Sequence, residues 1–211
     1  MPDFATPTVV VLGIGLSVAG YLAGSISSAI LVCRLMGLPD PRGIGSGNPG
    51  ATNVLRTGSK PAAALTLVGD LAKGIVPVVI ARWVGLPDLA VAAVGLASFA
   101  GHLYPVFFGL KGGKGVATAL GVLLAWSPLT GLAALIAWLA MAATFRYSSL
   151  AALTAAALAP FSLALLTGSW GLTTGGIVMT ALLVWRHRGN IQRLLAGSEP
   201  RIGARAKGGE A

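Results

Sequence analysis

One polar, glycine-rich loop carries several residues suited to binding an anion. It reads "GSGNPGATNVLR" over residues 45–56 and lies between two apolar segments. Glycine allows backbone amides to approach an anion closely, and the planar guanidinium of Arg56 matches a phosphate or a carboxylate. We predict an anion-binding loop, and a flexible polar connector is the alternative. The residues expected to bind are Gly45, Ser46, Gly47, Asn48, Gly50, Thr52, Asn53 and Arg56.

The same loop matches the spacing G-x-G-x-x-G of dinucleotide-binding proteins. That site needs a preceding β-strand and an acidic residue about 20 positions later, on the ribose. Here an apolar helix is predicted before the loop, and the residue 20 positions after Gly50 is Asp70, inside the next apolar segment. We therefore exclude a dinucleotide site.

A second loop, "KGGKGVAT" over residues 111–118, combines glycines with Lys114 directly before a predicted helix. It fails the nucleotide-hydrolase pattern, because Phe108 and Gly115 stand where a glycine and a magnesium-binding hydroxyl are needed. The amides, the ammonium group and the helix N-terminus can still bind a phosphate. Basic anchoring at a membrane surface explains the loop equally well. The candidate binding residues are Gly112, Gly113, Lys114 and Gly115.

The third cluster, "WRHRGNIQRLL" over residues 185–195, contains His187 and Asn190. His187 is a candidate general base or phosphate donor, and a surface histidine is the alternative. By itself, the cluster is explained by a basic amphipathic helix on anionic lipid.

Other polar residues are more ambiguous. Asp70 and Lys73 lie three residues apart in an apolar segment, so they share a helix face and can pair. Although ionisable residues in a membrane segment often mark function, we favour a structural pair. His102 is expected to satisfy a packing hydrogen bond. Ser148 and Ser149 are expected either to cap the next helix or to donate to a substrate.

Several chemistries are not predicted. The chain has one cysteine and two histidines that lie far apart, and no carboxylate cluster accompanies them, so we expect no metal and no cofactor. Ser46 does not lie in a nucleophile elbow, and no acidic residue is placed to orient His187. Ser46 is therefore interpreted as a hydrogen-bond donor.

The elements that position these loops are membrane helices. Hydrophobic residues make up 55% of the chain, charged residues 10%, and mean hydropathy is +0.82, whereas about a quarter of the residues of a soluble domain are charged. We predict an all-α integral membrane protein whose single domain covers residues 1–211. The net charge is +9, and a protein with such a charge usually binds nucleic acid or anionic lipid. Because the composition is apolar, we expect membrane lipid as a partner and no nucleic acid.

Hydropathy predicts seven transmembrane helices. The 12 residues of Gly115–Trp126 extend about 18 Å, so this segment either continues a loop that dips into the membrane or pairs with the next as a re-entrant hairpin. The segments are Pro7–Cys33, Pro61–Ala81, Leu89–Leu110, Gly115–Trp126, Leu129–Phe145, Leu150–Thr167 and Trp170–Trp185.

Charge placement predicts the orientation. All of the 15 Lys and Arg residues except Lys73 and Arg82 fall on one side when the seven segments alternate. Because basic loops remain in the cytoplasm, the N-terminus is expected outside and the C-terminus inside. All the polar loops then share the cytoplasmic face, and residues 197–211 are expected to form a flexible cytoplasmic tail.

With three loops in this order, the sequence resembles the bacterial acyl-phosphate:glycerol-3-phosphate acyltransferases from about Gly24 through Glu199. The motifs that carry the resemblance are "GSGNPGATNVLR" (45–56), "GHLYPVFFGLKGGKGVAT" (101–118) and "RHRGNIQRLLAGSE" (186–199), with "DLAKG" (70–74) and "RYSSL" (146–150) between them. The chain departs from the family at Pro49, where an isoleucine is common, and at Gly189, where an acidic residue is common.

The resemblance implies roles for individual residues. Ser46 and Arg56 match functional residues of the first motif, and residues 112–115 match the glycerol-3-phosphate-binding loop. His187 and Asn190 match active residues of the third motif. A serine such as Ser149 holds substrate, and Glu199 matches a structural glutamate.

The resemblance also implies the reaction. A long-chain acyl phosphate acylates the primary hydroxyl of glycerol-3-phosphate, yielding lysophosphatidic acid and inorganic phosphate for phospholipid synthesis at the bacterial inner membrane. We expect Ser46, Arg56 and Lys114 to bind phosphate, and His187 and Asn190 to position glycerol-3-phosphate. Either His187 or a substrate phosphate takes the proton.

Two rival functions remain at this point. An organic-phosphate transporter would use similar basic loops, but it needs polar groups along a path through the membrane. A lipid-binding scaffold leaves the polar clusters unexplained. An acyltransferase requires Arg56, Lys114 and His187 to meet in one pocket.

Overall fold

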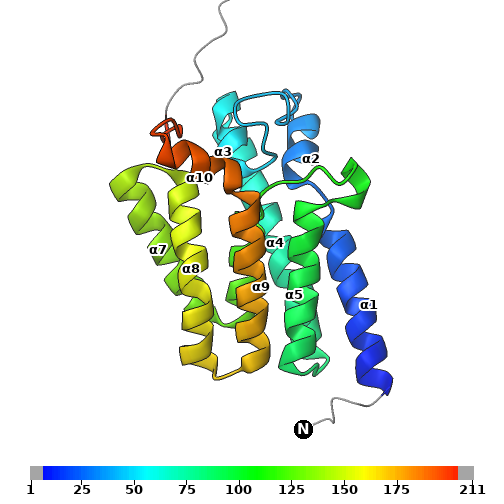
Figure 1. Cartoon of the computed structure of the whole chain (residues 1–211). Coiled ribbons are helices and arrows are strands. Elements are labelled where there is room, and N and C mark those ends of the chain that lie inside the picture. Colours follow the sequence, from blue (N-terminus) through cyan, green and yellow to red (C-terminus); the bar gives the residue numbers. More distant parts are fainter. Residues whose placement is uncertain (1–6, 204–211) are drawn as a thin grey trace, which may run out of the picture.

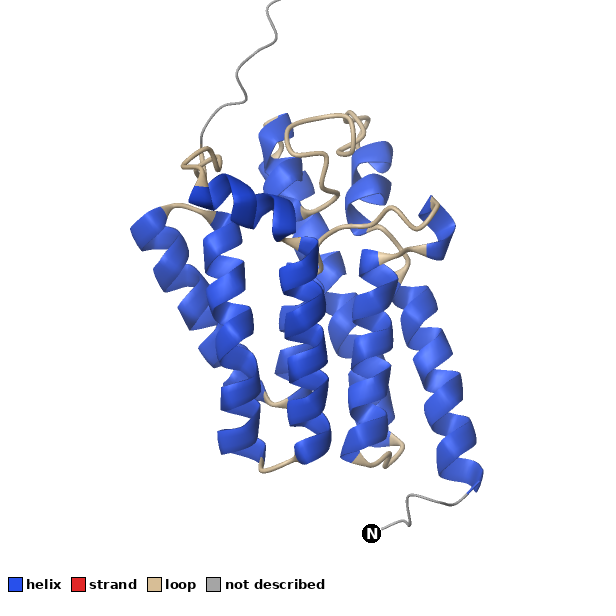
Figure 2. Ribbon diagram, in the orientation of Figure 1, coloured by secondary structure: helices blue, strands red, loops and turns tan. Residues whose placement is uncertain are grey.

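The computed structural model describes residues 7–203, which form helices and loops with no strand among them (Figure 2). Two short 3-10 turns, Leu55–Thr57 and Val106–Phe108, lie in the loops. The helices are α1 Pro7–Gly24, α2 Ser28–Leu35, α3 Ala51–Val54, α4 Lys60–Trp83, α5 Asp88–Leu103, α6 Val116–Trp126, α7 Pro128–Phe145, α8 Ser148–Thr167, α9 Trp170–Arg186 and α10 Arg188–Leu195.

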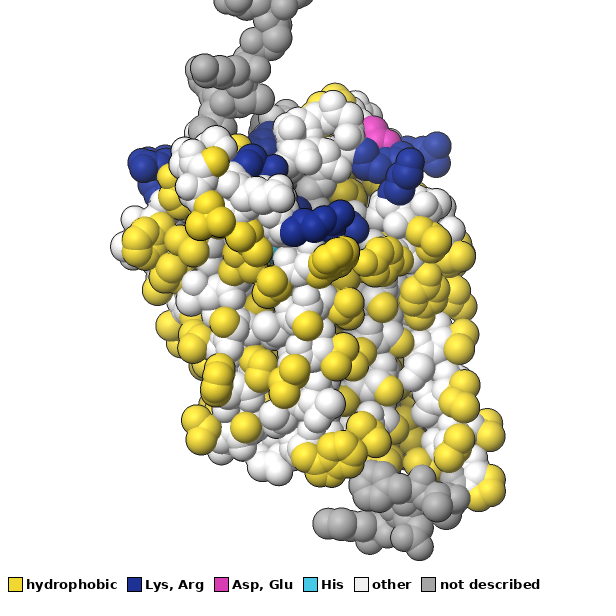
Figure 3. Space-filling view, in the orientation of Figure 1, with side chains coloured by type: hydrophobic (Ala, Val, Ile, Leu, Met, Phe, Trp, Pro, Cys, Tyr) yellow, Lys and Arg dark blue, Asp and Glu magenta, His cyan; other side chains and the backbone are white. Residues whose placement is uncertain are grey.

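The long helices run side by side, and all the polar loops lie at one end of the bundle. In Figure 1 the short helices α2, α3 and α10 gather at this end, and residue 7 begins at the other. Lys and Arg side chains mark the same end in Figure 3, above a body covered by hydrophobic side chains. The predicted gathering of the loops on one face is therefore confirmed.

Each of the seven predicted segments contains a helix. Five helical stretches are long and apolar enough to cross a membrane, whereas α6 has 11 residues and α9 has 17. Serine 127 alone separates α6 from α7, and its hydroxyl accepts a hydrogen bond from the Thr130 amide. Arg82 of α4 donates to the carbonyls of Ala125 and Trp126, so it satisfies the C-terminal end of the short helix.

Two predicted segments differ from the structure. The first segment breaks after Gly24, and side chains donate to carbonyls at and near the break: Ser25 Oγ donates to Tyr21 O at 2.8 Å and Lys73 Nζ donates to Ile26 O at 2.9 Å. The third segment ends at Leu103 rather than at residue 110, because residues before a proline such as Pro105 disfavour the helical conformation.

Small residues allow α1 and α5 to pack closely. A methyl group on Gly24 would collide with the backbone of Ser98, and one on Gly101 would collide with the carbonyl of Tyr21. Such close approach is typical of helix pairs in membranes. Larger side chains, among them Phe99, Val122 and Leu163, fill the core between the other helices.

The segment after α10 remains on the bundle. Glu199 has a side chain that is only 6% exposed, and the Ile202 amide donates to the Arg146 carbonyl at 2.6 Å. The Arg146 guanidinium donates back to the Ile202 carbonyl at 3.1 Å. The expected tail therefore excludes residues 197–203, and residues 204–211 lie outside the described part of the chain.

Two prolines lie inside membrane helices, and each frees a carbonyl four residues earlier. Pro77 of α4 frees the carbonyl of Lys73, which accepts a hydrogen bond from the Ser98 hydroxyl of α5. Pro160 of α8 frees the carbonyl of Ala156, which accepts from the Thr180 hydroxyl of α9 at 2.8 Å. Hydroxyl groups of neighbouring helices therefore replace the missing helical bonds.

We expect Thr180→Val to lower stability by about 1–3 kcal/mol, because the Ala156 carbonyl loses its donor in an apolar interior. Thermal unfolding in detergent measures the effect. Adding Pro160→Ala restores an amide donor to that carbonyl, so the double variant should unfold at a higher temperature than Thr180→Val alone. Equal melting temperatures for the single and double variants would contradict this account.

Candidate active site

A cavity of about 1030 Å³ brings the three sequence motifs together at the polar end of the bundle. Arg56, Lys114 and His187 all line it, which confirms that these distant residues share one pocket. The predicted residues that line the cavity are Gly45, Ser46, Asn48, Gly50, Thr52, Asn53, Arg56, Asp70, Lys114, Ser149, His187, Asn190 and Glu199. Of the other predicted residues, all described, Gly47, Lys73, Gly112, Gly113 and Gly115 lie outside its lining.

Asn53 organises the first loop. Its Oδ1 accepts from the Ser46 amide at 3.0 Å and the Ser46 hydroxyl at 3.2 Å, and from Arg56 at 3.3 Å. Its Nδ2 donates to the carbonyls of Pro41 and Ile44, at 2.7 and 3.1 Å. The sequence predicts that Asn53 donates to a substrate, but both the oxygen and the amino group of its side-chain amide are bonded within the loop. It holds Ser46 and Arg56 at the cavity wall.

The glycines of the second loop allow the loop to pack closely against His102 at the end of α5. Methyl groups at Gly112 and Gly113 would collide with the backbone and the ring of His102, and the Gly113 amide donates to the His102 carbonyl at 3.2 Å. This amide is therefore not free to bind phosphate, contrary to the prediction. Gly115 has a φ of +78°, a left-handed conformation that favours glycine, and α6 begins directly after it.

Arg186 holds this second loop, a role that the sequence did not reveal. Its guanidinium donates to the carbonyls of Gly112 and Gly113 at 2.8 and 3.0 Å, and it lies 5.4 Å from the centre of the Tyr104 ring. The only signal in the sequence was an arginine at the end of the last apolar segment, where membrane-interface anchors are common.

A continuous chain of hydrogen bonds joins the second and third motifs. Lys114 Nζ donates to Asn190 Oδ1 at 2.6 Å, and Asn190 Nδ2 donates to Glu199 Oε1 at 2.6 Å. Ser149 Oγ also donates to Glu199 Oε1 at 2.6 Å, and Arg193 Nε donates to Glu199 Oε2 at 2.8 Å. The Glu199 carboxylate thus accepts from Ser149, Asn190 and Arg193, and it orders all three side chains.

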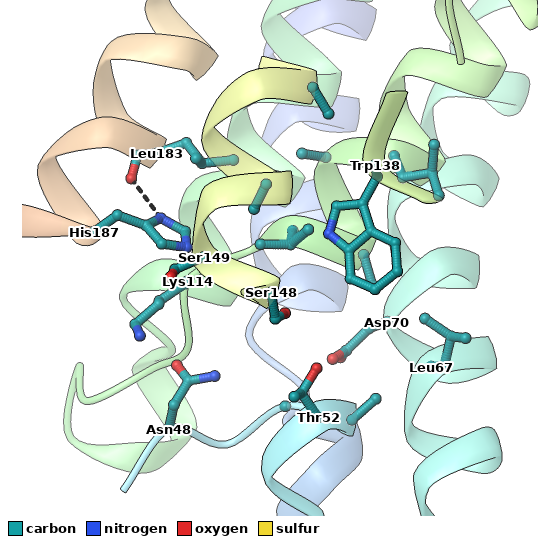
Figure 4. A pocket seen from close by; sticks show the side chains of 18 of the residues that line it. Asn48, Thr52, Leu67, Asp70, Lys114, Trp138, Ser148, Ser149, Leu183 and His187 are labelled. Carbon is teal, nitrogen blue, oxygen red and sulfur yellow. Dashed lines mark hydrogen bonds between the residues drawn. The ribbon is translucent and has the colours of Figure 1, made fainter. Parts of the chain in front are cut away.

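Ser148 and Ser149 are not helix caps. Tyr147 occupies the cap position, and the two serines are the first residues of α8, where both line the cavity. Figure 4 shows them between the His187 side of the cavity and the side formed by Thr52 and Asp70. The alternative prediction, donation to a substrate, remains a proposal.

His187 is 2% exposed, so it is not a surface histidine. Its Nδ1 lies 2.8 Å from the Leu183 carbonyl (Figure 4). Because a carbonyl only accepts, Nδ1 carries the proton and Nε2 presents a lone pair. Burial, reinforced by the positive charges of Lys114 and Arg186, lowers the pKa of His187 to about 4. The imidazole is therefore neutral at physiological pH.

Burial also lowers the pKa of Lys114 to about 8, and the charges of Arg193, Arg186 and Arg56 add to the effect. The nearby carboxylate of Glu199 opposes it. The cavity therefore concentrates positive charge that an anionic ligand would neutralise.

Asp70 and Lys73 form the predicted pair, with 2.9 Å between Nζ and Oδ1. The ring of His102 lies close by, its Nδ1 3.1 Å from the Thr118 hydroxyl and 3.6 Å from Asp70 Oδ1. The predicted packing role of His102 agrees with this contact, although both His102 and Asp70 also line the cavity.

Apolar side chains of five helices line the rest of the cavity. They are Leu67 and Leu71 of α4, Leu120, Leu123 and Leu124 of α6, Leu135, Trp138 and Leu139 of α7, Ala152, Ala155, Ala156 and Ala159 of α8, and Met179 and Leu183 of α9. The cavity thus has a polar, cationic part and an apolar part, which suits a ligand with an anionic head and an alkyl chain. Within residues 7–203 no group of three or more His, Cys, Asp or Glu side chains could hold a metal ion.

Known proteins are similar to this chain over nearly its whole length. Residues 14–197 match the family model described as glycerol-3-phosphate acyltransferase. A glycerol-3-phosphate acyltransferase of Thioalkalivibrio sulfidiphilus is 59% identical over 93% of this chain and 97% of its own length. One from Halorhodospira halophila is 58% identical over 92% of this chain and 98% of its own.

Two solved structures are also similar. Crystal structures of PlsY (YgiH), an integral membrane glycerol 3-phosphate acyltransferase, match with TM-scores of 0.87 for the glycerol 3-phosphate form and 0.86 for the lysophosphatidic acid form. Their identities are 44% and 42%, and each match covers 91% of this chain and 96% of the solved chain.

The pKa of Lys114 predicts a pH dependence of phosphate binding. Affinity for a phosphate monoester such as glycerol-3-phosphate should fall about tenfold between pH 7 and pH 9, because the charged fraction of an amine with a pKa of about 8 falls by that factor. Calorimetric titration at several pH values measures this. In Lys114→Arg, whose side chain remains charged, the affinity should no longer fall between pH 7 and pH 9. An equal fall in both proteins would show that another group causes the pH dependence.

The contacts of Arg186 with the second loop predict an effect of this residue on substrate affinity. Arg186→Lys loses the two-pronged contact with the second loop, so KM for glycerol-3-phosphate should rise about tenfold, with a smaller change in kcat. Steady-state kinetics measures both. The matched control is Arg188→Lys, because exposed Arg188 bonds only to the Trp185 carbonyl and stacks on the Trp185 ring. Similar changes in both variants would contradict a specific role for Arg186.

Proposed function

The chain belongs to the glycerol-3-phosphate acyltransferase family, and we propose that it transfers the acyl group of an acyl phosphate to the primary hydroxyl of glycerol-3-phosphate. The products are lysophosphatidic acid and inorganic phosphate. The observation that carries this proposal is the two-part cavity, in which Lys114, Arg56 and His187 line a cationic region continuous with an apolar one. Both substrates have phosphate groups, and one has an alkyl chain.

Arg56, Ser46 and Lys114 are proposed to bind phosphate, and His187 and Asn190 to position glycerol-3-phosphate. Lys114 donates to Asn190, so a bound phosphate would replace or share this bond. The neutral His187 offers Nε2 as an acceptor for the other hydroxyl of glycerol-3-phosphate, which leaves the proton of the attacking hydroxyl free to pass to phosphate. Glu199 accepts from Asn190 and holds it in place, and Ser149 in turn donates to Glu199.

The low pKa of His187 favours a positioning role over a base. A group with a pKa of about 4 removes a proton from an alcohol poorly. The attacking oxygen forms the ester bond as the bond between the acyl carbon and the phosphate oxygen breaks, and the hydroxyl proton passes to the departing phosphate. Holding the two reactants in line supplies much of the barrier reduction.

We further propose that seven helices cross the inner membrane, with the N-terminus outside and the active site on the cytoplasmic face. The support is the concentration of Lys and Arg at the end that carries the site (Figure 3). Positive residues favour the cytoplasmic side. A purely transporting role is disfavoured, because basic lining residues such as Arg56, Lys114 and Arg193 belong to the segments of the polar end, whereas most of the lining from the long helices is apolar.

Purified protein in detergent should release lysophosphatidic acid and phosphate from glycerol-3-phosphate and a long-chain acyl phosphate, as mass spectrometry and a phosphate assay would show. No compartment is needed, which excludes transport as the explanation. Acyl-CoA and acyl carrier protein donors run in parallel should be inactive. Transfer from acyl-CoA at the same rate would contradict the proposed donor.

The role of His187 has its own test. His187→Gln keeps an acceptor near the position of Nε2, so kcat should fall less than about 100-fold, the lower bound expected for losing a general base. In His187→Ala, which has no acceptor at this position, kcat should fall further. Kinetics at saturating substrate measures both. Equal losses of about 1000-fold or more in the two variants would make the histidine an obligatory base.

A further inference from the structure

A short segment after α10, residues 199–202, forms part of the cavity wall. We call it the 199–202 strap, and it lies at the corner between α7 and α8 (Figure 1). The strap is held at both ends, because Glu199 accepts from Ser149 and Ile202 bonds to Arg146 in both directions. All four of its residues line the cavity. The two residues between these fixed ends therefore have a defined place beside the polar part of the cavity.

One of these two residues is Arg201, and an aromatic ring orients it. Its guanidinium carbon lies 5.6 Å from the centre of the Tyr147 ring, and its Nε donates to the Tyr147 hydroxyl at 3.4 Å. A cation over the face of an aromatic ring is attracted to it. Within residues 7–203, the two terminal amino groups of Arg201 have no hydrogen-bond or ion-pair partner. They can therefore still bind an anion in a planar, forked arrangement.

The charge of the two substrates calls for such a cation. A phosphate group carries roughly −1.5 to −2 near neutral pH, so an acyl phosphate and glycerol-3-phosphate together bring roughly three to four negative charges. The phosphate-binding residues proposed above, Arg56 and Lys114, supply two positive charges. Arg193 also lines the cavity, but it pairs with Glu199 at 2.8 Å. Among the described lining residues, Arg201 is the remaining Lys or Arg, and no carboxylate there pairs with it.

We propose that Arg201 is a further phosphate-binding residue, which the 199–202 strap and Tyr147 hold at the polar part of the cavity. This rests on the proposed function, because both substrates of that reaction carry a phosphate group. Tyr147 does not line the cavity, so it is a positioning residue that acts through Arg201. Glycerol-3-phosphate and the acyl phosphate offer the same group, and their two KM values distinguish which phosphate Arg201 binds.

Arg201→Gln tests the proposal. It removes the charge, so KM for one of the two substrates should rise about fivefold, the upper range for an exposed ion pair, while kcat stays within about twofold. Arg201→Lys keeps the charge and loses the planar fork, so its KM should lie between those of the unmodified protein and Arg201→Gln. Steady-state kinetics with each substrate varied in turn measures both KM values. Calorimetric titration with glycerol-3-phosphate measures binding without turnover.

The matched control is Arg188→Gln. Arg188 begins α10 at the same end of the bundle (Figure 1), and it also stacks on an aromatic ring, with 4.9 Å to the centre of the Trp185 ring. It does not line the cavity. The control therefore removes an equal charge from the same end without touching the site, and both KM values should stay within about twofold.

The positioning role of Tyr147 is tested by a double-mutant cycle. Tyr147→Ala removes the ring that orients Arg201, so it should raise the same KM as Arg201→Gln does. In the double variant KM should rise no further than in Arg201→Gln alone, because the two side chains act as one unit. If Tyr147 only supported the fold, its effect would instead lower kcat and the melting temperature and would add to that of Arg201→Gln.

The outcomes separate this assignment from the proposed function. Unchanged KM values for both substrates in Arg201→Gln would overturn the role of Arg201, and so would an equal rise in Arg188→Gln. A loss of kcat at constant KM would do the same. If the unmodified protein neither binds glycerol-3-phosphate nor transfers an acyl group, it is the proposed function that fails.

Discussion

The structure depends on satisfying backbone carbonyls that interruptions of its apolar helices leave without a helical donor. Four interruptions in the helices expose such groups: the prolines of α4 and α8, the break after α1 and the early end of α6. A side chain from another element satisfies each one, namely Ser98, Thr180, Lys73 and Arg82. Since each of these donors reaches a helix or a break outside its own helix, the same bonds that repair the backbone also fix which elements lie side by side.

Positive charge at the polar end has two effects that support each other. Burial and neighbouring arginines make the charged form of Lys114 costly, and a bound phosphate dianion would offset this cost. The same positive surroundings help keep His187 neutral, so that Nε2 remains an acceptor. One electrostatic arrangement therefore attracts the anionic substrates and sets the protonation state of the group that faces them.

Hydropathy located the seven helical segments because each is apolar over most of its length. Residue type also located most of the polar lining of the cavity, since phosphate-binding chemistry uses few residue types. The network behind the site was not accessible in this way. Glu199 lies in a short polar segment that looks disordered until Ser149, about 50 positions earlier, is placed beside it. Similarly, Asn53 and Gly113 have the right donors, but tertiary contacts have already used them.

The hydrogen bonds of the two serines favour direct transfer over an acyl-enzyme. A serine nucleophile must give its proton to a base, yet the Ser46 hydroxyl donates to the amide oxygen of Asn53, which is not a base. Ser149 donates to Glu199. Burial acts to raise the pKa of Glu199, but hydrogen bonds from Ser149, Asn190 and Arg193 hold it below its usual value. Glu199 is therefore a poor base too. An acyl phosphate is already activated, so a cavity that aligns it with glycerol-3-phosphate needs no covalent intermediate.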